Sequence, residues 1–180
     1  MARKMKLTAV LSAVAAVIFA GLYGRTGSDV SLTLAITFGT AAYHFVMRLL
    51  VGSVIDLLLN NHVDYRKRWF RVSAAEETLY KKLKVKSWKG KMATYDPNCF
   101  DRNLHSWDEI AQATCQAELV HELIIVLSFL PVLAAIPFGA LPVFVITSAL
   151  AACVDALFVV MQRYNRPRII RLVEASKRNK

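Results

Sequence analysis

Residues 117–138 read AELVHELIIVLSFLPVLAAIPF, and this stretch decides the fold class. From Leu119 onward it is almost wholly apolar and reaches the roughly 20 residues that a helix needs to cross a bilayer core. Three ionisable side chains, Glu118, His121 and Glu122, stand at its start, where helical spacing puts them broadly on one side. Such groups at the mouth of a membrane-length segment are costly unless they pair or take part in chemistry. The stretch predicts a transmembrane helix that opens either on an interfacial turn or on a proton-transfer site.

The rest of the chain repeats this apolar pattern. Further blocks of membrane length span 7–23, 30–59 and 141–161, and 56% of the 180 residues are hydrophobic, more than soluble domains of this length usually hold. We therefore expect an all-α integral membrane protein, folded as a single membrane domain with four transmembrane helices. The expected spans cover about 7–24, 32–58, 119–137 and 141–161. The first block is too long for a signal peptide and lacks a convincing cleavage site, so it is expected to be retained.

Basic residues flank the expected spans on one side of the membrane. Arg3, Lys4 and Lys6 precede the first span, eleven Lys or Arg lie within 66–102, seven lie within 163–180, and the connections 25–29 and 137–142 hold one between them. By the positive-inside rule, both termini, a basic interfacial region at 60–117 and a basic tail at 162–180 are expected in the cytoplasm. We expect a multi-pass protein of the plasma membrane. This topology and attraction to anionic membrane lipids explain the net charge of +10, so no nucleic-acid partner is expected.

Familiar catalytic and metal-binding patterns are missing from the sequence. The three cysteines are odd in number and show no paired-ligand spacing, so we expect neither a zinc site nor disulfides. There is no G-x-S-x-G element, no P-loop and no G-x-G-x-x-G element. An enzyme built on this chain would most simply use acid–base chemistry with two bound substrates.

Local capping patterns predict two helices in the polar region. Ser73 with Glu76, and Ser106 with Glu109, have the spacing of a capping box. The second helix is expected to continue into the span that begins at Leu119.

Ionisable side chains also occur inside the expected spans. In the second span His44 and Arg48 are four residues apart and Asp56 lies eight beyond, so the three follow one stripe of a helix. Such residues usually face the bundle or a wet cavity, although Arg48 and Asp56 could instead lie at the interface. Asp155 is the only charged residue of the fourth span.

Two basic segments offer groups that bind anions. The lysine run 81–91 includes Lys86 and Lys89, with Trp88 as an apolar anchor and Asp96 following. It would either grip a phosphorylated cofactor or form a solvated face. Residues 162–168 read QRYNRPR, in which two arginines present forked donors to carboxylate or phosphate, unless the segment is only a stop-transfer anchor. Pro167 disfavours helical geometry at Arg166, or begins a new helix.

The elements AELVH at 117–121 and QRYNRPR at 162–168, separated by one hydrophobic hairpin, resemble those of the glycosyl-4,4'-diaponeurosporenoate acyltransferase family. These are small bacterial membrane enzymes of carotenoid pathways such as staphyloxanthin synthesis. A looser similarity extends upstream through KVKSWK at 84–89, so that the resemblance covers about 69–171. The residue after the family's histidine tends to be aromatic, whereas here it is Glu122, which puts Glu122 in doubt as a family site residue.

The resemblance implies a membrane-embedded O-acyltransferase that moves a fatty acyl group from a thioester, acyl-CoA, to a hydroxyl of a glycosylated terpenoid or other lipid. His121 would act as general base, oriented by Glu118. The expected substrate-binding residues are Arg163, Tyr164, Asn165, Arg166, Lys86, Trp88, Lys89, Asp96, His44 and Arg48. No tightly bound cofactor is expected, and the expected partners are acyl-CoA, the lipid or glycolipid acceptor and membrane lipids. The alternatives are a membrane methyltransferase or other small lipid-modifying transferase, and a non-enzymatic lipid-binding scaffold.

Overall fold

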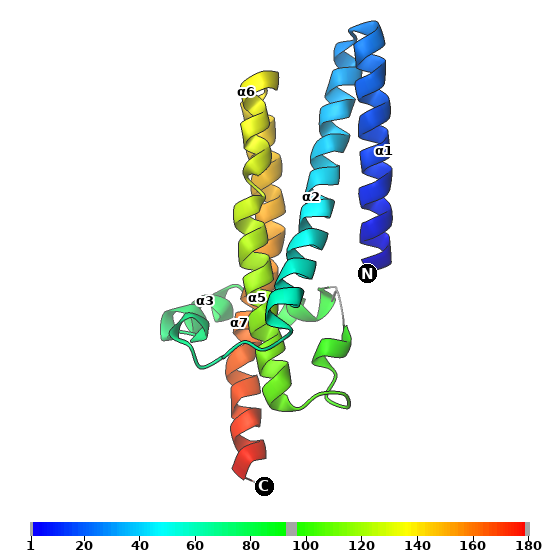
Figure 1. Ribbon diagram of the computed structural model, residues 1–180. Helices are drawn as coiled ribbons and strands as arrows, with labels where there is room; N and C mark the ends of the chain where they lie inside the picture. Colours follow the sequence, from blue (N-terminus) through cyan, green and yellow to red (C-terminus); the bar gives the residue numbers. More distant parts are fainter. Residues whose placement is uncertain (1, 93–96, 179–180) are drawn as a thin grey trace.

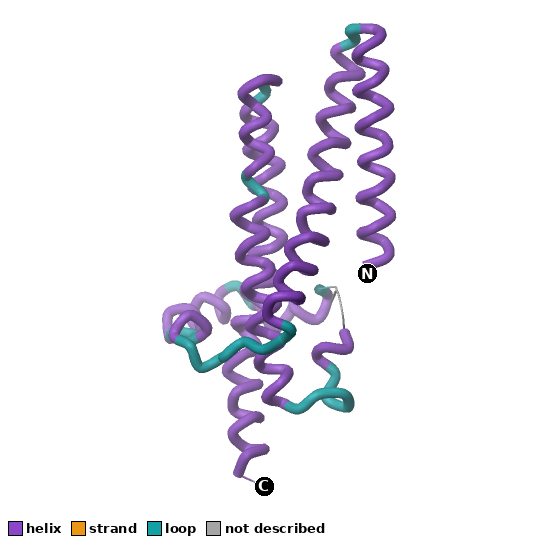
Figure 2. Tube along the Cα trace, viewed as in Figure 1, coloured by secondary structure: helices purple, strands orange, loops and turns teal. Residues whose placement is uncertain are grey.

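The computed structural model describes residues 2–92 and 97–178, and Figure 1 shows an all-helical architecture over these ranges. Within them, four helical segments are long and apolar enough to cross a membrane: Arg3–Thr26, Asp29–Leu59, Trp107–Phe138 and Leu141–Arg178. Short loops join the helices (Figure 2). The predicted fold class is confirmed.

The first two long helices form an N-terminal hairpin. Helix α1 (Ala2–Thr26) packs along α2 (Asp29–Leu59), and the two run side by side in Figure 1. The reversal between them uses Gly27 with φ +62°, a left-handed conformation that a residue without a Cβ adopts at little cost. This hairpin supplies α2, the only one of its two helices that packs extensively on the rest of the described bundle.

The other two spans form a C-terminal hairpin. Helix α5 (Trp107–Leu127) continues through η4 (Leu130–Ala134) and α6 (Ala135–Phe138), and the chain then returns as α7 (Leu141–Arg178) along α5. Helix α2 leans on α5 through one small apolar cluster made of Met47, Val51 and Ile124. Helices α2, α5 and α7 therefore come together near this cluster, where their charged side chains can reach one another.

Helix α7 passes through Pro167 without a break. The expectation that helical geometry is disfavoured at Arg166, or that a new helix begins at the proline, is therefore wrong. A proline inside a helix loses one backbone hydrogen bond, a cost that packing can offset. Here the fully buried Arg166 side chain anchors this turn of α7 to neighbouring elements.

The region between the two hairpins is a set of short helices wrapped around one end of the bundle (Figure 1). They are η1 (Arg68–Phe70), α3 (Ala74–Lys82), α4 (Val85–Trp88), η2 (Lys89–Lys91) and η3 (Pro97–Phe100). A core of Val63, Tyr65, Phe70, Ala111, Cys115 and Val173 fastens this region to α5 and α7. We call this end of the molecule, formed by residues 60–92 and 97–117 and the last turns of α7, the basic end.

Both predicted capping boxes are confirmed. Ser73 and Glu76 cap the start of α3 reciprocally, and Ser106 and Glu109 cap the start of α5 in the same way. Helix α5 then runs without interruption into the apolar segment that begins at Leu119, as the sequence predicts.

Candidate active site

The centre of the bundle holds a histidine paired with a buried aspartate. Nδ1 of His121 on α5 lies 2.9 Å from Oδ1 of Asp155 on α7, and the Asp155 side chain is only 2% exposed. The His121 ring also stacks on Phe158, with the ring centroids 4.6 Å apart. Neutral histidine donates from one ring nitrogen only, so the tautomer that donates from Nδ1 to Asp155 leaves Nε2 as a proton acceptor. A histidine held this way by a carboxylate is arranged to act as a general base.

Helix α2 supplies the counter-charge for this aspartate. Arg48 forms an ion pair with the other carboxylate oxygen of Asp155, and its Nη1 atom donates to the carbonyl of His44 at 3.0 Å. An aspartate within a membrane span is costly unless it finds a partner, and Asp155 has partners on both sides. The chain of contacts from His121 through Asp155 to Arg48 therefore joins α5, α7 and α2 at one point.

The expected pairing of His121 with Glu118 is wrong, because the partner of the ring is Asp155. Glu118 is fully buried and lies between two arginines of α7. Its Oε1 atom accepts a 2.6 Å hydrogen bond from Nη1 of Arg163, and its Oε2 atom forms an ion pair with Arg166. Both Glu118 and His121 face α7, yet they meet different turns of that helix. A catalytic role for Glu118 stays a prediction.

Sequence reasoning gave Asp155 no role. The signal for it was nevertheless present, because a lone acid in an apolar span needs a cationic or hydrogen-bonding partner. What the sequence did not contain was the register of α7 against α5, which selects His121 as one of these partners. The sequence-predicted residues His44 and Arg48 lie beside this pair, while both ring nitrogens of His44 are buried and have no hydrogen-bond partner among the described residues.

Arg163 on α7 forms hydrogen bonds and ion pairs with three neighbouring elements. Besides pairing with Glu118, it donates from Nε to Glu76 at 2.7 Å. Its Nη1 and Nη2 atoms donate to the backbone carbonyls of Trp69 and Arg71 respectively, each at 3.0 Å. Partial burial acts to raise the pKa of Glu76, but hydrogen bonds from Arg163 and Ser73 outweigh it and lower that pKa to about 2. These contacts occupy the forked donors of Arg163 that the sequence analysis assigned to a carboxylate or phosphate.

Arg166, one turn further along α7, binds the same segment of the chain as Arg163. Its guanidinium donates to the carbonyls of Phe70 and Thr114, both at 3.2 Å, and it stacks over the Phe70 ring. Glu122, which the sequence placed in doubt, accepts a 3.0 Å hydrogen bond from the indole of Trp69. The two arginines therefore hold the segment 69–71 against α5 and α7.

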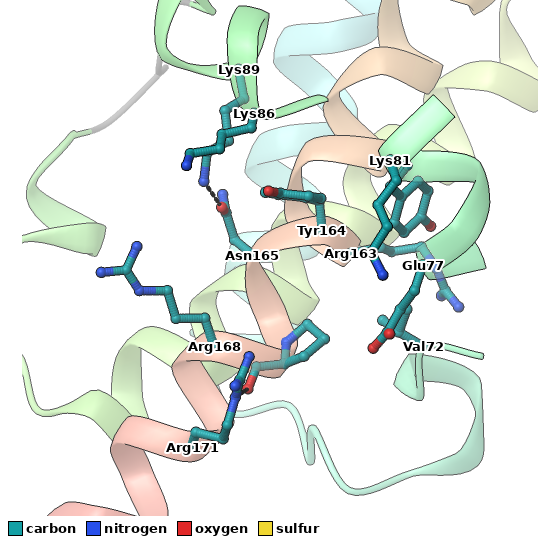
Figure 3. Close-up of a pocket in the computed structure, with 12 residues that line it drawn as sticks. Val72, Glu77, Lys81, Lys86, Lys89, Arg163, Tyr164, Asn165, Arg168 and Arg171 are labelled. Atoms are coloured by element: carbon teal, nitrogen blue, oxygen red, sulfur yellow. Dashed lines mark hydrogen bonds between the residues drawn. The ribbon is translucent and has the colours of Figure 1, made fainter. Parts of the chain in front are cut away.

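A second candidate site is a basic cavity of about 350 Å³ between α3, α4 and α7 (Figure 3). Its lining combines six cationic side chains with one acid, two tyrosines and an asparagine: Lys81, Lys86, Lys89, Arg163, Arg168, Arg171, Glu77, Tyr80, Tyr164 and Asn165. We call it the basic cavity. Its size and charge suit a ligand that carries phosphate groups.

Lys89 lines the basic cavity and contacts two other residues of its lining. It donates to the side chain of Asn165, and its Nζ atom lies 4.8 Å from the centroid of the Tyr164 ring. Partial burial, followed by the charges of Arg168 and Lys86, lowers the pKa of Lys89. Close packing of several cations favours a bound anion at this place.

The structure brings together most of the sequence-predicted site residues, but in two groups. His121, His44 and Arg48 lie in the bundle, while Lys86, Lys89, Tyr164 and Asn165 lie at the basic cavity. Trp88 is not part of that lining; its indole donates to the carbonyl of Leu83. Asp96 lies outside the described residues. In the described ranges no group of three or more His, Cys, Asp or Glu side chains is suited to a metal ion.

Comparison with known proteins identifies the chain. Searches among curated proteins and among solved structures gave no match. A sequence model for glycosyl-4,4'-diaponeurosporenoate acyltransferases matches residues 65–175, which include α3, α5 and nearly all of α7. The match contains His121, Asp155 and the basic cavity, whereas His44 and Arg48 of α2 lie outside it. The resemblance seen in the sequence is thereby confirmed: the chain belongs to the glycosyl-4,4'-diaponeurosporenoate acyltransferase family, and it is an acyltransferase of a carotenoid pathway.

Proposed function

We propose that the protein transfers a fatty acyl group from acyl-CoA to a hydroxyl of a glycosylated terpenoid, with His121 as general base. Family membership supports acyl transfer to a glycosyl carotenoid. The observation that carries the assignment of the base is the contact between Nδ1 of His121 and Asp155 at 2.9 Å, inside a helical bundle of membrane length.

In the proposed reaction the acceptor hydroxyl gives its proton to Nε2 of His121 while its oxygen attacks the thioester carbonyl. The tetrahedral intermediate then collapses with cleavage of the carbon–sulfur bond. The leaving thiolate takes the proton from the imidazolium, so that the products are an ester and free coenzyme A. Asp155 keeps the ring in the productive tautomer and stabilises the imidazolium that forms. Arg48 supplies the positive charge that pairs with the Asp155 side chain within the bundle.

We assign the nucleotide part of the donor to the basic cavity. Coenzyme A carries several phosphate groups, and Lys81, Lys86, Lys89 and Arg168 line the cavity with cationic donors to phosphate. Arg163 lines the same cavity, but its hydrogen bonds go to protein groups. It therefore contributes positive electrostatic potential to the cavity more than direct contacts with the ligand. The aromatic face of Tyr164 gives the adenine ring a surface on which to stack.

The proposed donor agrees with the expected topology. Acyl-CoA is a cytoplasmic metabolite, and the positive-inside rule assigns the basic end and both termini to the cytoplasm. The donor would then reach His121 from the basic end, and the acceptor would come from the bilayer.

The direct test uses the full chain purified in detergent, with isotope-labelled acyl-CoA and glycosyl-4,4'-diaponeurosporenoate. We expect label in the lipid product with the wild type and a loss of at least about a hundredfold in kcat with His121→Ala. Wild-type rates in His121→Ala would show that His121 is not the base. Labelled S-adenosylmethionine in the same assay addresses the methyltransferase alternative and is expected to give no labelled lipid.

A further inference from the structure

An apolar cavity of about 690 Å³ lies between the two hairpins, in the half of the bundle away from the basic end. Its walls come from α1, α2, η4, α6 and α7. On α2 the lining residues are Leu32, Ala35, Ile36, Gly39, Thr40 and Tyr43, whose three- and four-residue spacing marks one face of the helix. The volume is within the range of about 300–1,000 Å³ that ligand sites in proteins usually have.

The same face of α2 leads from this cavity to the candidate active site. His44 follows Thr40 by four residues, and Arg48 follows His44 by four, so the three lie on successive turns of one side. At the floor of the cavity, Tyr43 donates to the carbonyl of Leu127 on α5 at 2.8 Å, and its ring meets that of His44 edge-on at 5.5 Å. The apolar cavity therefore ends at the ring of Tyr43, and the neighbouring His44, which is not part of the lining, lies one turn before the arginine that pairs with Asp155.

His44, beside Tyr43, is a polar group that the described part of the protein does not satisfy. Its two ring nitrogens are both buried, and neither has a hydrogen-bond partner in the described part of the chain. A buried polar atom without a partner is costly, and a bound hydroxyl group would satisfy it. Sugars present several hydroxyl groups of this kind.

We propose that the apolar cavity binds the terpenoid tail of the acceptor and that His44 hydrogen-bonds its glycosyl head. This inference rests on the proposed function. The acyl chain of the donor, which also begins at the thioester, is the other apolar candidate. We assign the cavity to the acceptor because the unsatisfied His44 beside it suits a sugar hydroxyl, which an acyl chain lacks. The walls of this site that come from α1 and α2 lie outside the matched family region, whereas those from η4, α6 and α7 lie inside it.

Gly39 gives a selective way to test the tail site. A Cβ added at Gly39, which lines the cavity, meets no atom within 4 Å, so Gly39→Leu fills the cavity without a clash at its base. Gly52 is on the same helix, its added Cβ also meets nothing within 4 Å, and it does not line the cavity, which makes Gly52→Leu the matched control. Two acceptors are compared, glycosyl-4,4'-diaponeurosporenoate and octyl glucoside, whose short tail does not need the cavity.

We expect Gly39→Leu to raise KM for the long acceptor by at least about tenfold, while the values for octyl glucoside and acyl-CoA stay within about twofold of the wild type. Gly52→Leu should change none of them. His44→Phe should raise KM for both acceptors, because both carry the sugar, and His44→Gln should restore part of the loss. Equal effects of Gly39→Leu on the two acceptors, or none on either, would overturn the inference. Absence of acyl transfer by the wild type would instead overturn the proposed function.

Discussion

Nδ1 of His121 and Oδ1 of Asp155 lie 2.9 Å apart, although the two residues are 34 positions apart in the chain and belong to antiparallel helices. This contact gives the catalytic histidine of the proposed reaction its orientation. It also explains why a single aspartate is present in the apolar part of α7, where an isolated carboxylate would be costly.

Replacing Asp155 with asparagine should lower kcat for acyl transfer by about 10²–10⁴-fold, because the ring loses its oriented tautomer and its charge partner. KM for acyl-CoA should not change, since the basic cavity is distant from this contact. The measurement is steady-state kinetics in detergent. The double variant with His121→Ala should be no slower than His121→Ala alone, as expected for residues that act as a unit. Fully additive losses would contradict the dyad.

Arg48→Met should destabilise the folded protein by about 3–5 kcal/mol, because it leaves Asp155 as a buried charge without its cationic partner. The double variant Arg48→Met with Asp155→Leu removes both charges and should recover most of that stability. Acyl transfer should not recover, since Asp155 is gone. Thermal unfolding in detergent, measured beside activity, separates the two effects; an unstable double variant would contradict this account of the ion pair.

Glu118→Gln should act mainly on stability. The substitution removes the negative charge between Arg163 and Arg166, and loss of one partner from a buried ionic cluster typically costs about 3–5 kcal/mol. The kcat of the fraction that remains folded should stay within about tenfold of the wild type, in contrast to His121→Ala. A stable Glu118→Gln protein with kcat lowered a thousandfold would restore the original prediction that Glu118 is catalytic.

Lys89→Met should raise KM for acyl-CoA by about tenfold, the effect of losing roughly 1.4 kcal/mol of binding free energy at one phosphate contact. Lys82 is the matched control, because it is an exposed lysine at the end of α3 that does not line the basic cavity. Lys82→Met should leave KM unchanged. Because the lowered pKa of Lys89 makes it lose its charge at a lower pH than an ordinary lysine, donor affinity should weaken on the alkaline side earlier in the wild type than in Lys89→Arg.

The pairing of Glu76 with Arg163 predicts a specific dependence of stability on pH. The folded pKa of about 2 is below the ordinary value of 4.5, so the ionised carboxylate favours the folded state. This stabilisation is complete above about pH 4.5 and is lost as the pH falls toward about 2. The stability difference between wild type and Glu76→Gln should therefore be large near neutral pH and shrink in acid.

Unfolding midpoints of both proteins in detergent, compared near pH 7 and near pH 3, give this measurement. Glu77→Gln is the control, because this neighbouring acid is exposed. A difference between wild type and Glu76→Gln that does not change with pH would show that the carboxylate charge is not what stabilises this contact.

The sequence by itself determined the features that depend on short stretches of chain. The four apolar segments needed only length and composition, and the helix starts at Ser73 and Ser106 needed only residues three positions apart. Two separated motifs were enough to identify the family. Each of these signals can be read without knowing how one helix packs on another.

The tertiary structure alone decided which charged groups meet. Glu118 precedes His121 by three residues and was the natural partner on one helix, but the register of α7 presents Asp155 to the ring and two arginines to Glu118. The sequence predicted that the forked donors of Arg163 bind a ligand. In the folded protein they instead donate to Glu76, Glu118 and two backbone carbonyls. The physical reason is that a buried charge takes whichever partner helix packing brings within reach, however far away that partner lies in the chain.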